Sequence, residues 1–175
     1  DEEAVESHLK GGSTIGTYAI RQDDSTTFLA CVRFDELSWQ DDAGIFKRAA
    51  RELGIEVVIE RSRSGNGAHA WIFFEYPIPA RIARSLGTLI LARCAETSAK
   101  LSLDSYDRFF PSQDYLPKGG FGNLVALPLQ KIPREKGNSC FLTDEFRAHQ
   151  DQWAYLSTVR RLSFDEVRKI LDDYL

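Results

Sequence analysis

Hydrophobic and polar positions along the chain repeat with two different periods. Six segments alternate with a period of two, or form short apolar runs, and are rich in β-branched and aromatic residues, which predicts strands. These segments are 17–22, 26–34, 55–61, 68–76, 101–110 and 123–130. The sequence SRSGNG, which links the third and fourth of them, has the composition of a hairpin turn, so these two strands are predicted to pair directly.

Helical spacing occurs in three other segments. A helix is predicted over 41–54, because apolar positions recur every three or four residues until Gly54 ends the pattern. A second helix is predicted to begin after Pro79 and to carry one apolar stripe. The third closes the chain, because Ser163 and Glu166 have the spacing of a capping box.

The order of these elements predicts an α+β fold. Strand, helix, strand and hairpin are followed by helix, strand and strand, which builds a two-layer sandwich with a mixed sheet and flanking helices. Residues 1–14 are polar and end in a Gly-rich stretch, so they are predicted to be a frayed lead-in or linker before a domain over 15–175. Because the chain starts at Asp1, this domain is expected to be excised from a longer protein.

Composition narrows the class of protein. The chain has 175 residues, 43% hydrophobic and 27% charged, which is ordinary for one globular domain. It shows no run long enough to span a bilayer and no signal peptide, and its three cysteines lie far apart among apolar residues, as expected of reduced thiols in a cytoplasmic protein. A net charge of −4 argues against a protein that coats nucleic acid, but it is compatible with a local basic groove.

The predicted hairpin turn carries residues suited to phosphate. The candidates are Arg61, Arg63, Ser64, Gly65, Asn66, Gly67 and His69. Guanidinium groups match the geometry of phosphate, and glycines let backbone N–H groups approach an anion closely. No Walker motif is present, and a tight hairpin with exposed arginines and a histidine at the edge of the core explains the same residues. The turn alone therefore leaves both interpretations open.

Longer strings of residues carry a family resemblance. They are IGTYAI, FLACVRFD, ERSRSGNGAHAWIFFE, SYDRFFPSQD, LPKGGFGNLVALPLQ and DQWAYLSTVRRLS, in that order. From about residue 16 to 162 the chain resembles the archaeo-eukaryotic primase superfamily, the primase-polymerases, and within it the primase domain of TOTE conflict systems. The resemblance implies a catalytic core with an RRM-like sheet, Mg²⁺ or Mn²⁺ held by acidic residues, and template-directed transfer of nucleotides from nucleoside triphosphates.

The motifs of this family assign roles to residues of the chain. In the family, two acids of a first motif and one of a third hold metal, and a histidine of the second contacts the triphosphate. Ser64 and His69 match the second motif, and Asp107 matches the third, with Asp104 as a less favoured neighbour. Asp35 matches the second acid of the first motif. The resemblance therefore implies Asp35, Asp107 and His69 as catalytic residues, with the two aspartates as metal ligands.

Arg33 departs from the family pattern. Where the family has Asp-x-Asp, this chain has Arg33, Phe34 and Asp35. Alternate residues of a strand share a face, so Arg33 is predicted to lie beside Asp35 and toward Asp107. A guanidinium at this position removes an oxygen ligand and occupies the lone pairs of its neighbours, which predicts weakened metal binding and weakened or lost catalysis.

The sequence leaves three interpretations of Arg33 open. The domain is a degenerate primase that binds nucleotide or nucleic acid without extending it, or it is active with Glu36, Asp41 or Asp42 as a substitute ligand, or Arg33 is an inactivating change in an active parent. The second is disfavoured, because Glu36 would point to the opposite face of a continuing strand. The two aspartates lie at a helix start, which already explains them.

Other residues are candidates for contact with nucleic acid or for the core. Aromatic residues are interleaved with Arg108 and Lys118, a combination that stacks bases and follows a backbone, although Phe109 or Phe110 is expected to be buried. Lys118 is favoured for contact with phosphate, and the basic segment 131–136 is either a contact for the template backbone or a solvated loop.

The remaining histidines and tryptophans are given structural roles. His8 and His149 have no partner spacing and are predicted to be surface residues, whereas Trp39 and Trp153 are predicted to pack in the interior. No spacing suggests a Ser-His-Asp or Cys-His arrangement, so hydrolase chemistry has no support.

The sequence thus predicts a primase-polymerase-type domain that handles nucleotides and single-stranded or primer-template nucleic acid, with nucleotidyl transfer weakened or lost. The alternative is a catalytically inactive module of a multidomain defence or replication protein. Such a module would bind nucleic acid or dock onto a helicase or nuclease partner domain.

Overall fold

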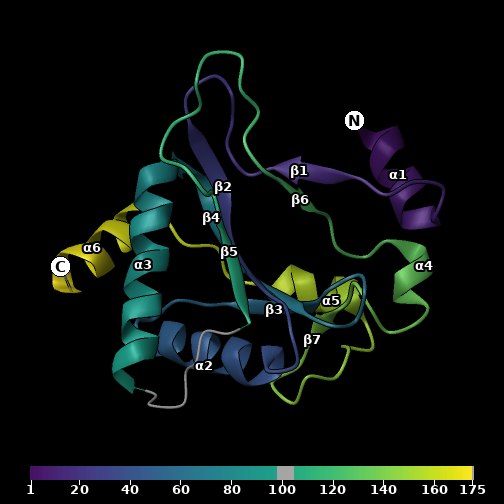
Figure 1. The fold of residues 1–175 in the computed structure, drawn as a ribbon. Coiled ribbons are helices and arrows are strands. Elements are labelled where there is room, and N and C mark those ends of the chain that lie inside the picture. Colours follow the sequence, from purple (N-terminus) through teal and green to yellow (C-terminus); the bar gives the residue numbers. More distant parts are fainter. Residues whose placement is uncertain (98–104, 175) are drawn as a thin grey trace.

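A five-stranded sheet forms the centre of the computed structural model, which describes residues 1–97 and 105–174. Its strands lie in the order β5 (Tyr106–Phe110), β2 (Thr26–Phe34), β4 (Ala68–Pro79), β3 (Val58–Arg61) and β7 (Phe141–Leu142). A separate two-stranded ribbon pairs β1 (Gly16–Tyr18) with β6 (Leu124–Ala126) and lies to one side of the sheet (Figure 1). The helices are α1 (Glu2–Lys10), α2 (Trp39–Glu52), α3 (Ala80–Thr97), α4 (Lys131–Arg134), α5 (Gln152–Thr158) and α6 (Phe164–Tyr174).

The fold is α+β as predicted, but every pairing between these strands is antiparallel, so the prediction of a mixed sheet is wrong. The reason lies in the connections. α2 leads from β2 to β3, and β4 then returns by a hairpin and inserts between those two strands. α3 leads from β4 to β5 in the same way, with β2 between them. Because each helical crossover skips one position, neighbouring strands always run in opposite directions.

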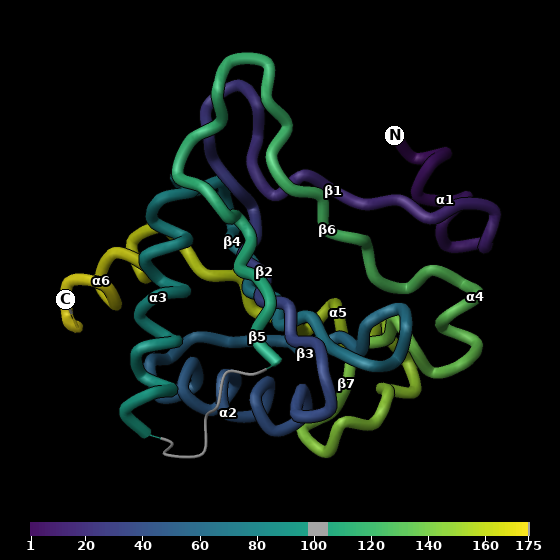
Figure 2. Tube along the Cα trace, in the orientation of Figure 1, coloured from purple at the N-terminus to yellow at the C-terminus, as the bar shows by residue number. Residues whose placement is uncertain are grey.

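The two faces of the sheet have different neighbours. Alternation along β2 sends Ala30, Val32 and Phe34 to the face covered by α2 and α3, where they join the larger apolar core. Cys31 points to the other face and packs with Trp71 in a smaller cluster that includes residues of β5, β6 and β7. Figure 2 follows the chain through both layers and shows that its two ends lie on opposite sides of the molecule. No helix in the described ranges is both long and apolar enough to cross a membrane.

Several elements are shorter than the sequence predicts. The strand expected over 123–130 is reduced to β6, and Pro128, which has no N–H for a ladder, lies two residues beyond its end. The strand expected over 101–110 is observed from Tyr106, and its first residues lie outside the described part of the chain. The capping box of α6 is confirmed, since Ser163 N–H and Oγ–H donate to the Glu166 carboxylate and Glu166 N–H donates to Ser163 Oγ.

The first residues of the chain form a capped helix, α1. Asp1 caps α1 by accepting a hydrogen bond from Ala4 N–H. His8 in this helix is only 1% exposed, and its ring bridges two backbone groups: Nε2 lies 2.9 Å from Pro128 O, and Nδ1 accepts from Ile15 N–H. The prediction of His8 as a surface residue is therefore wrong. Its ring ties α1 to the segment that follows β6.

Other aromatic residues give a mixed outcome. Trp39 and Phe110 are buried as predicted, but Trp153 is 55% exposed, so its prediction as a packing residue is wrong. His149 is half-buried and stacks on Tyr155 with 3.7 Å between the ring centroids. Burial raises the pKa of Tyr155 to about 12. The three cysteines are buried and free.

Candidate functional site

Four charged or ionisable residues form a row across the sheet face that is not covered by α2 and α3. Arg33 on β2 lies opposite Arg108 on β5 and, on its other side, opposite His69 on β4. Glu60 on β3 lies opposite His69. Cross-strand neighbours have Cβ atoms about 4.5–5.5 Å apart, so the register alone brings these side chains together.

Asp107 reaches the same row through a bulge in β5. Arg33 pairs with Arg108, but the next residue, Phe34, pairs with Tyr106, so Asp107 is the extra residue. A bulge redirects the side chain at that point. As a result, Asp107 Oδ2 lies 3.6 Å from Arg33 Nη1.

Arg33 joins two carboxylates. Its Nη2 lies 2.8 Å from Asp35 Oδ2, in addition to the contact between Nη1 and Asp107. The exposed fractions of the three side chains are 46% for Arg33, 34% for Asp35 and 40% for Asp107, so the cluster is open to solvent. The predicted position of Arg33 between the two candidate metal ligands is confirmed.

His69 is held by a buried carboxylate. Its Nδ1 lies 2.8 Å from Glu60 Oε2, and the Trp71 indole N–H donates to the same oxygen at 3.2 Å. Glu60 is 2% exposed, so this acceptor is inaccessible to bulk water. Assigning the ring proton to Nδ1 gives this contact one donor and one acceptor. The other ring nitrogen, Nε2, lies on the side of the imidazole away from Glu60.

Glu60 was not predicted from the sequence as a functional residue. A signal was nevertheless present: with a turn over 62–67, pairing outward from the turn sets Arg61 against Ala68 and Glu60 against His69, as observed. The missed step was to use the hairpin to read the register of the two strands.

The turn between β3 and β4 is built by its own small side chains. Ser62 Oγ and Ser64 Oγ lie 3.1 Å apart, and Ser64 Oγ accepts from Asn66 N–H. Gly65 has a φ of 84°, which favours glycine. A Cβ on Gly67 would lie 2.4 Å from the carbonyl oxygen of Phe34, so only glycine lets the turn approach the end of β2.

The turn and the ribbon enclose a cleft of about 630 Å³. One wall is polar and carries Arg33, Asp35, Arg63, Ser64 and His69. The opposite wall is mainly apolar and comes from segments 14–16 and 124–126, that is, from β1, β6 and the residues before β1. An adjoining cleft shares Arg33, Asp35 and Ser64 and is also lined by Gly65 and Asn66.

Some predicted ligands lie elsewhere. The Arg61 guanidinium stands over the Trp39 ring, 5.8 Å from its centroid, because Arg61 follows Glu60 and points to the other face. Gly67 and Lys118 do not line either cleft among the residues described. Asp104 lies outside the described residues. The basic segment 131–136 starts with the short helix α4 and is not a simple loop.

The candidates for a substitute acid are also placed. β2 ends at Phe34, so the alternation that would turn Glu36 to the opposite face does not apply; Glu36 has a φ of 68° and lines the adjoining cleft with Asp35. Asp42 is 2% exposed and accepts hydrogen bonds from Ser38 and Ser105. Asp42 is therefore already satisfied within the fold.

The residues present do not fit the pair of divalent ions that the family implies. Such ions lie roughly 3.5–4 Å apart and need several oxygen ligands. Oδ2 of Asp35 and Oδ2 of Asp107 lie 2.8 and 3.6 Å from the Arg33 guanidinium, which places a fixed positive charge where a cation would bind. Within the described ranges, no group of three or more His, Cys, Asp or Glu side chains has the arrangement of a metal site.

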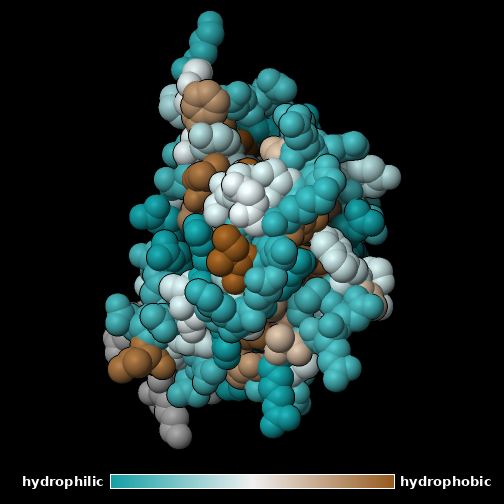
Figure 3. Space-filling model, turned by 90° about the vertical axis from the view of Figure 1, so that its right-hand side faces the viewer, coloured by the Kyte–Doolittle hydropathy of each residue, from teal (hydrophilic) through white to brown (hydrophobic). Residues whose placement is uncertain are grey.

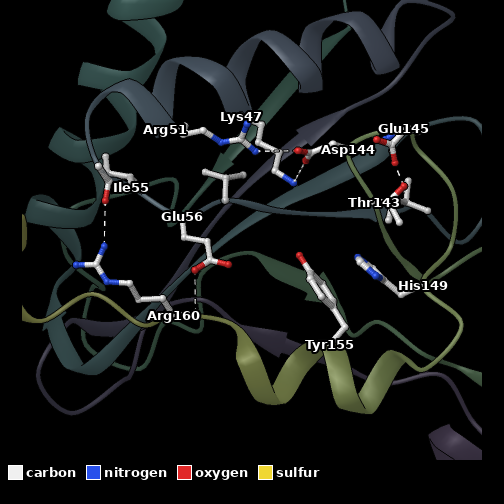
Figure 4. Close-up of a pocket in the computed structure, with 13 residues that line it drawn as sticks. Lys47, Arg51, Ile55, Glu56, Thr143, Asp144, Glu145, His149, Tyr155 and Arg160 are labelled. Carbon is white, nitrogen blue, oxygen red and sulfur yellow. Dashed lines mark hydrogen bonds and ion pairs between the residues drawn. The ribbon is translucent and has the colours of Figure 1, made fainter.

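A further cleft, of about 620 Å³, lies between the end of α2 and the segment around α5 (Figure 4). Its basic residues already have partners. Lys47 and Arg51 contact Asp144 at 2.7 and 3.0 Å, and Arg160 pairs with Glu166. The first cleft is therefore the better candidate for an anionic ligand.

An antiparallel sheet with two helices on one face and a charged cleft around a hairpin turn on the other defines the class of the protein as an α+β domain with one open, charged face. The family model of the TOTE conflict system, Archaeo-Eukaryotic Primase domain, matches residues 1–170, and the chain therefore belongs to this family. The resemblance seen in the sequence is confirmed. No curated protein matches the chain.

Among solved structures, the chain is similar to the polymerase domain from Mycobacterium tuberculosis Ligase D in complex with DNA. The identity is 16% and the TM-score 0.44, and 85% of this chain is covered. The chain spans about half of that structure, 52%.

Proposed function

We propose that the chain is a primase-polymerase-type domain that binds nucleotides and single-stranded or primer-template nucleic acid, and that its nucleotidyl transfer is weakened or lost. One observation carries this proposal: the guanidinium of Arg33 lies between Asp35 and Asp107. The family membership supplies the class of reaction, and Arg33 changes what the site can do within that class.

Binding is supported by the two walls of the cleft. The polar wall offers Arg63, Ser64 and His69 to phosphate oxygens, and the apolar wall of the ribbon suits a base or sugar. The volume of about 630 Å³ lies within the range of about 300–1,000 Å³ that is usual for small-molecule sites. A nucleoside phosphate has both kinds of surface in one molecule.

Loss of transfer follows from the electrostatics of the same cleft. Activation of a 3′-hydroxyl and neutralisation of a triphosphate are tasks of divalent ions in this chemistry. Arg33 supplies positive charge, but it has no open coordination position and cannot generate a nucleophile. The cleft can therefore attract phosphate without being equipped to transfer it.

A primer-extension assay with Mn²⁺ tests this proposal, with the parent chain beside Arg33→Asp. We expect extension by the parent to be lower than by Arg33→Asp by orders of magnitude, while isothermal titration calorimetry detects nucleotide binding to the parent. Arg81→Asp, an exposed position on α3, makes the same change of charge outside the cleft and should behave like the parent.

The other outcomes have distinct meanings. Extension by the parent that equals extension by Arg33→Asp would show that the acid is dispensable and would refute the loss of transfer. Absence of nucleotide and strand binding in both forms would favour the alternative, a module that docks helicase or nuclease domains.

A cytoplasmic location remains part of the proposal.

A further inference from the structure

Three exposed side chains form a ridge along the rim of the cleft. Tyr18 at the end of β1 pairs in register with Leu124 at the start of β6, and the ring of Phe121 lies 5.3 Å from that of Tyr18. The exposed fractions are 47% for Tyr18, 54% for Phe121 and 54% for Leu124. Leu124 also lines the cleft, so this aromatic ridge continues the apolar wall outward.

The loop that carries Phe121 is held in place by polar contacts. Gln22 Nε2 donates to Gly120 O at 3.1 Å, which ties this loop to the turn before β2. Gly120 N–H donates to Pro117 O, and Gly119 has a φ of 78°. These bonds position the Phe121 ring without burying it. The ridge is therefore a defined surface feature: its rings are exposed to solvent and have no partner outside the ridge among the described residues.

The surroundings of the ridge favour a nucleic-acid strand over a protein. Lys118 in the same loop and Arg63 in the cleft form no ion pair within the residues described. Figure 3, which views the molecule from the right-hand side of Figure 1, shows hydrophobic residues in small groups among hydrophilic ones. Stable protein interfaces use about 20–30 residues on each side, far more than this ridge offers.

We propose that the aromatic ridge stacks the unpaired bases of a nucleic-acid strand that leaves the cleft, with Lys118 beside its phosphates. The inference rests on the proposed function, because it continues the nucleotide-binding cleft. Stacking on rings tolerates every base, and a flanking cation follows the backbone. Tyr18 and Phe121 would thus hold single strands without sequence preference.

Fluorescence anisotropy with dye-labelled oligothymidylate and oligouridylate tests the ridge. Tyr18→Leu and Phe121→Leu keep apolar volume but remove the ring, and each should weaken strand binding by about five- to hundredfold. Tyr174→Leu is the matched control: Tyr174 is 53% exposed, much as the ridge residues are, and it ends α6, which lies on the opposite side of the molecule from β1 and β6 (Figure 1). Its strand affinity should equal that of the parent, and thermal melting should show all three variants folded.

Calorimetric titration of the parent with nucleotide separates the two proposals. If the parent binds nucleotide while both ridge variants bind strands as tightly as the parent, the proposal for the ridge is overturned and the proposed function stands. If the parent binds neither nucleotide nor strands, both proposals fall. Equal weakening by Tyr174→Leu would also overturn the proposal for the ridge, because the effect would not depend on position.

Discussion

Arg33→Asp tests the structure of the cleft independently of any catalytic assay. It turns two attractive contacts, at 2.8 and 3.6 Å, into two repulsions. Unit charges about 4 Å apart interact by about 4 kcal/mol at an effective dielectric constant of 20, but pairs as exposed as these are worth only about 0–1 kcal/mol each. Losing two attractions and gaining two repulsions of similar size should therefore lower the free energy of unfolding by about 1–3 kcal/mol when no divalent cation is present.

A divalent cation should reverse this loss in the variant alone. Three neighbouring carboxylates without a guanidinium offer the oxygen ligands that Mn²⁺ prefers. A cation at about 100 times its dissociation constant stabilises the folded state by about 2.7 kcal/mol. For a domain of this size, about 1 kcal/mol raises Tm by about 2–4 °C, so the expected rise is about 5–11 °C. The parent should show no such rise, because its Arg33 guanidinium lies between the two carboxylates and repels a cation.

Thermal denaturation in Mn²⁺ and in EDTA, at constant ionic strength, measures the difference. Arg81→Asp serves as the control, since it makes the same change of charge on the exposed surface of α3. The interpretation of Arg33 would be refuted if Mn²⁺ raised the Tm of the parent as much as that of Arg33→Asp. It would also be refuted if the variant gained nothing, because the remaining acids would then not form a cation site even without the guanidinium.

Two further predictions concern stability. Glu60→Ala leaves two buried N–H donors without their acceptor, one from His69 and one from Trp71. At about 1–3 kcal/mol per orphaned donor, urea unfolding should show a loss of about 2–6 kcal/mol in the free energy of unfolding. A loss below about 1 kcal/mol would mean that water replaces the carboxylate. Hydrogen bonds from Lys47 and Arg51 hold the pKa of Asp144 below its usual value. Their contribution to the free energy of unfolding is therefore present above the unfolded-state pKa of Asp144, and it is lost as pH falls through the lowered folded-state pKa. Asp144→Asn should therefore lower the free energy of unfolding by up to about 1 kcal/mol at neutral pH and should be as stable as the parent in strong acid. A difference in stability that does not depend on pH would contradict this assignment.

The position of the cleft was predictable because it depends on local periodicity. Alternation placed Arg33 and Asp35 on one face, and turn chemistry identified the hairpin that brings His69 beside them. Both signals lie within a few residues of the chain. The sheet as a whole was not predicted correctly, because strand order depends on where β4 inserts, and no local pattern encodes that insertion.

Other features could not be predicted because they depend on contacts between distant segments. The bulge that turns Asp107 toward Arg33 is a property of the β2–β5 register, not of the sequence SYDRFF. The burial of His8 depends on a backbone carbonyl 120 residues away. Each of these side chains has an ordinary local environment in the sequence, and only the tertiary fold distinguishes it.

The geometry around Arg33 bears on how the chain tolerates its departure from the family. A site with three acids and no cation would carry unbalanced negative charge, so bound metal would stabilise its folded state. In this chain one guanidinium contacts both remaining carboxylates, and the protein itself offsets part of their negative charge. Arg33 therefore does more than delete a ligand: it supplies positive charge at the place where the ion would supply it. A hydrophobic or neutral residue at position 33 would abolish the metal site without supplying that charge. Arg33→Ala should accordingly be less stable than the parent in EDTA. Arg33→Lys keeps the positive charge, so its stability in EDTA should be close to that of the parent.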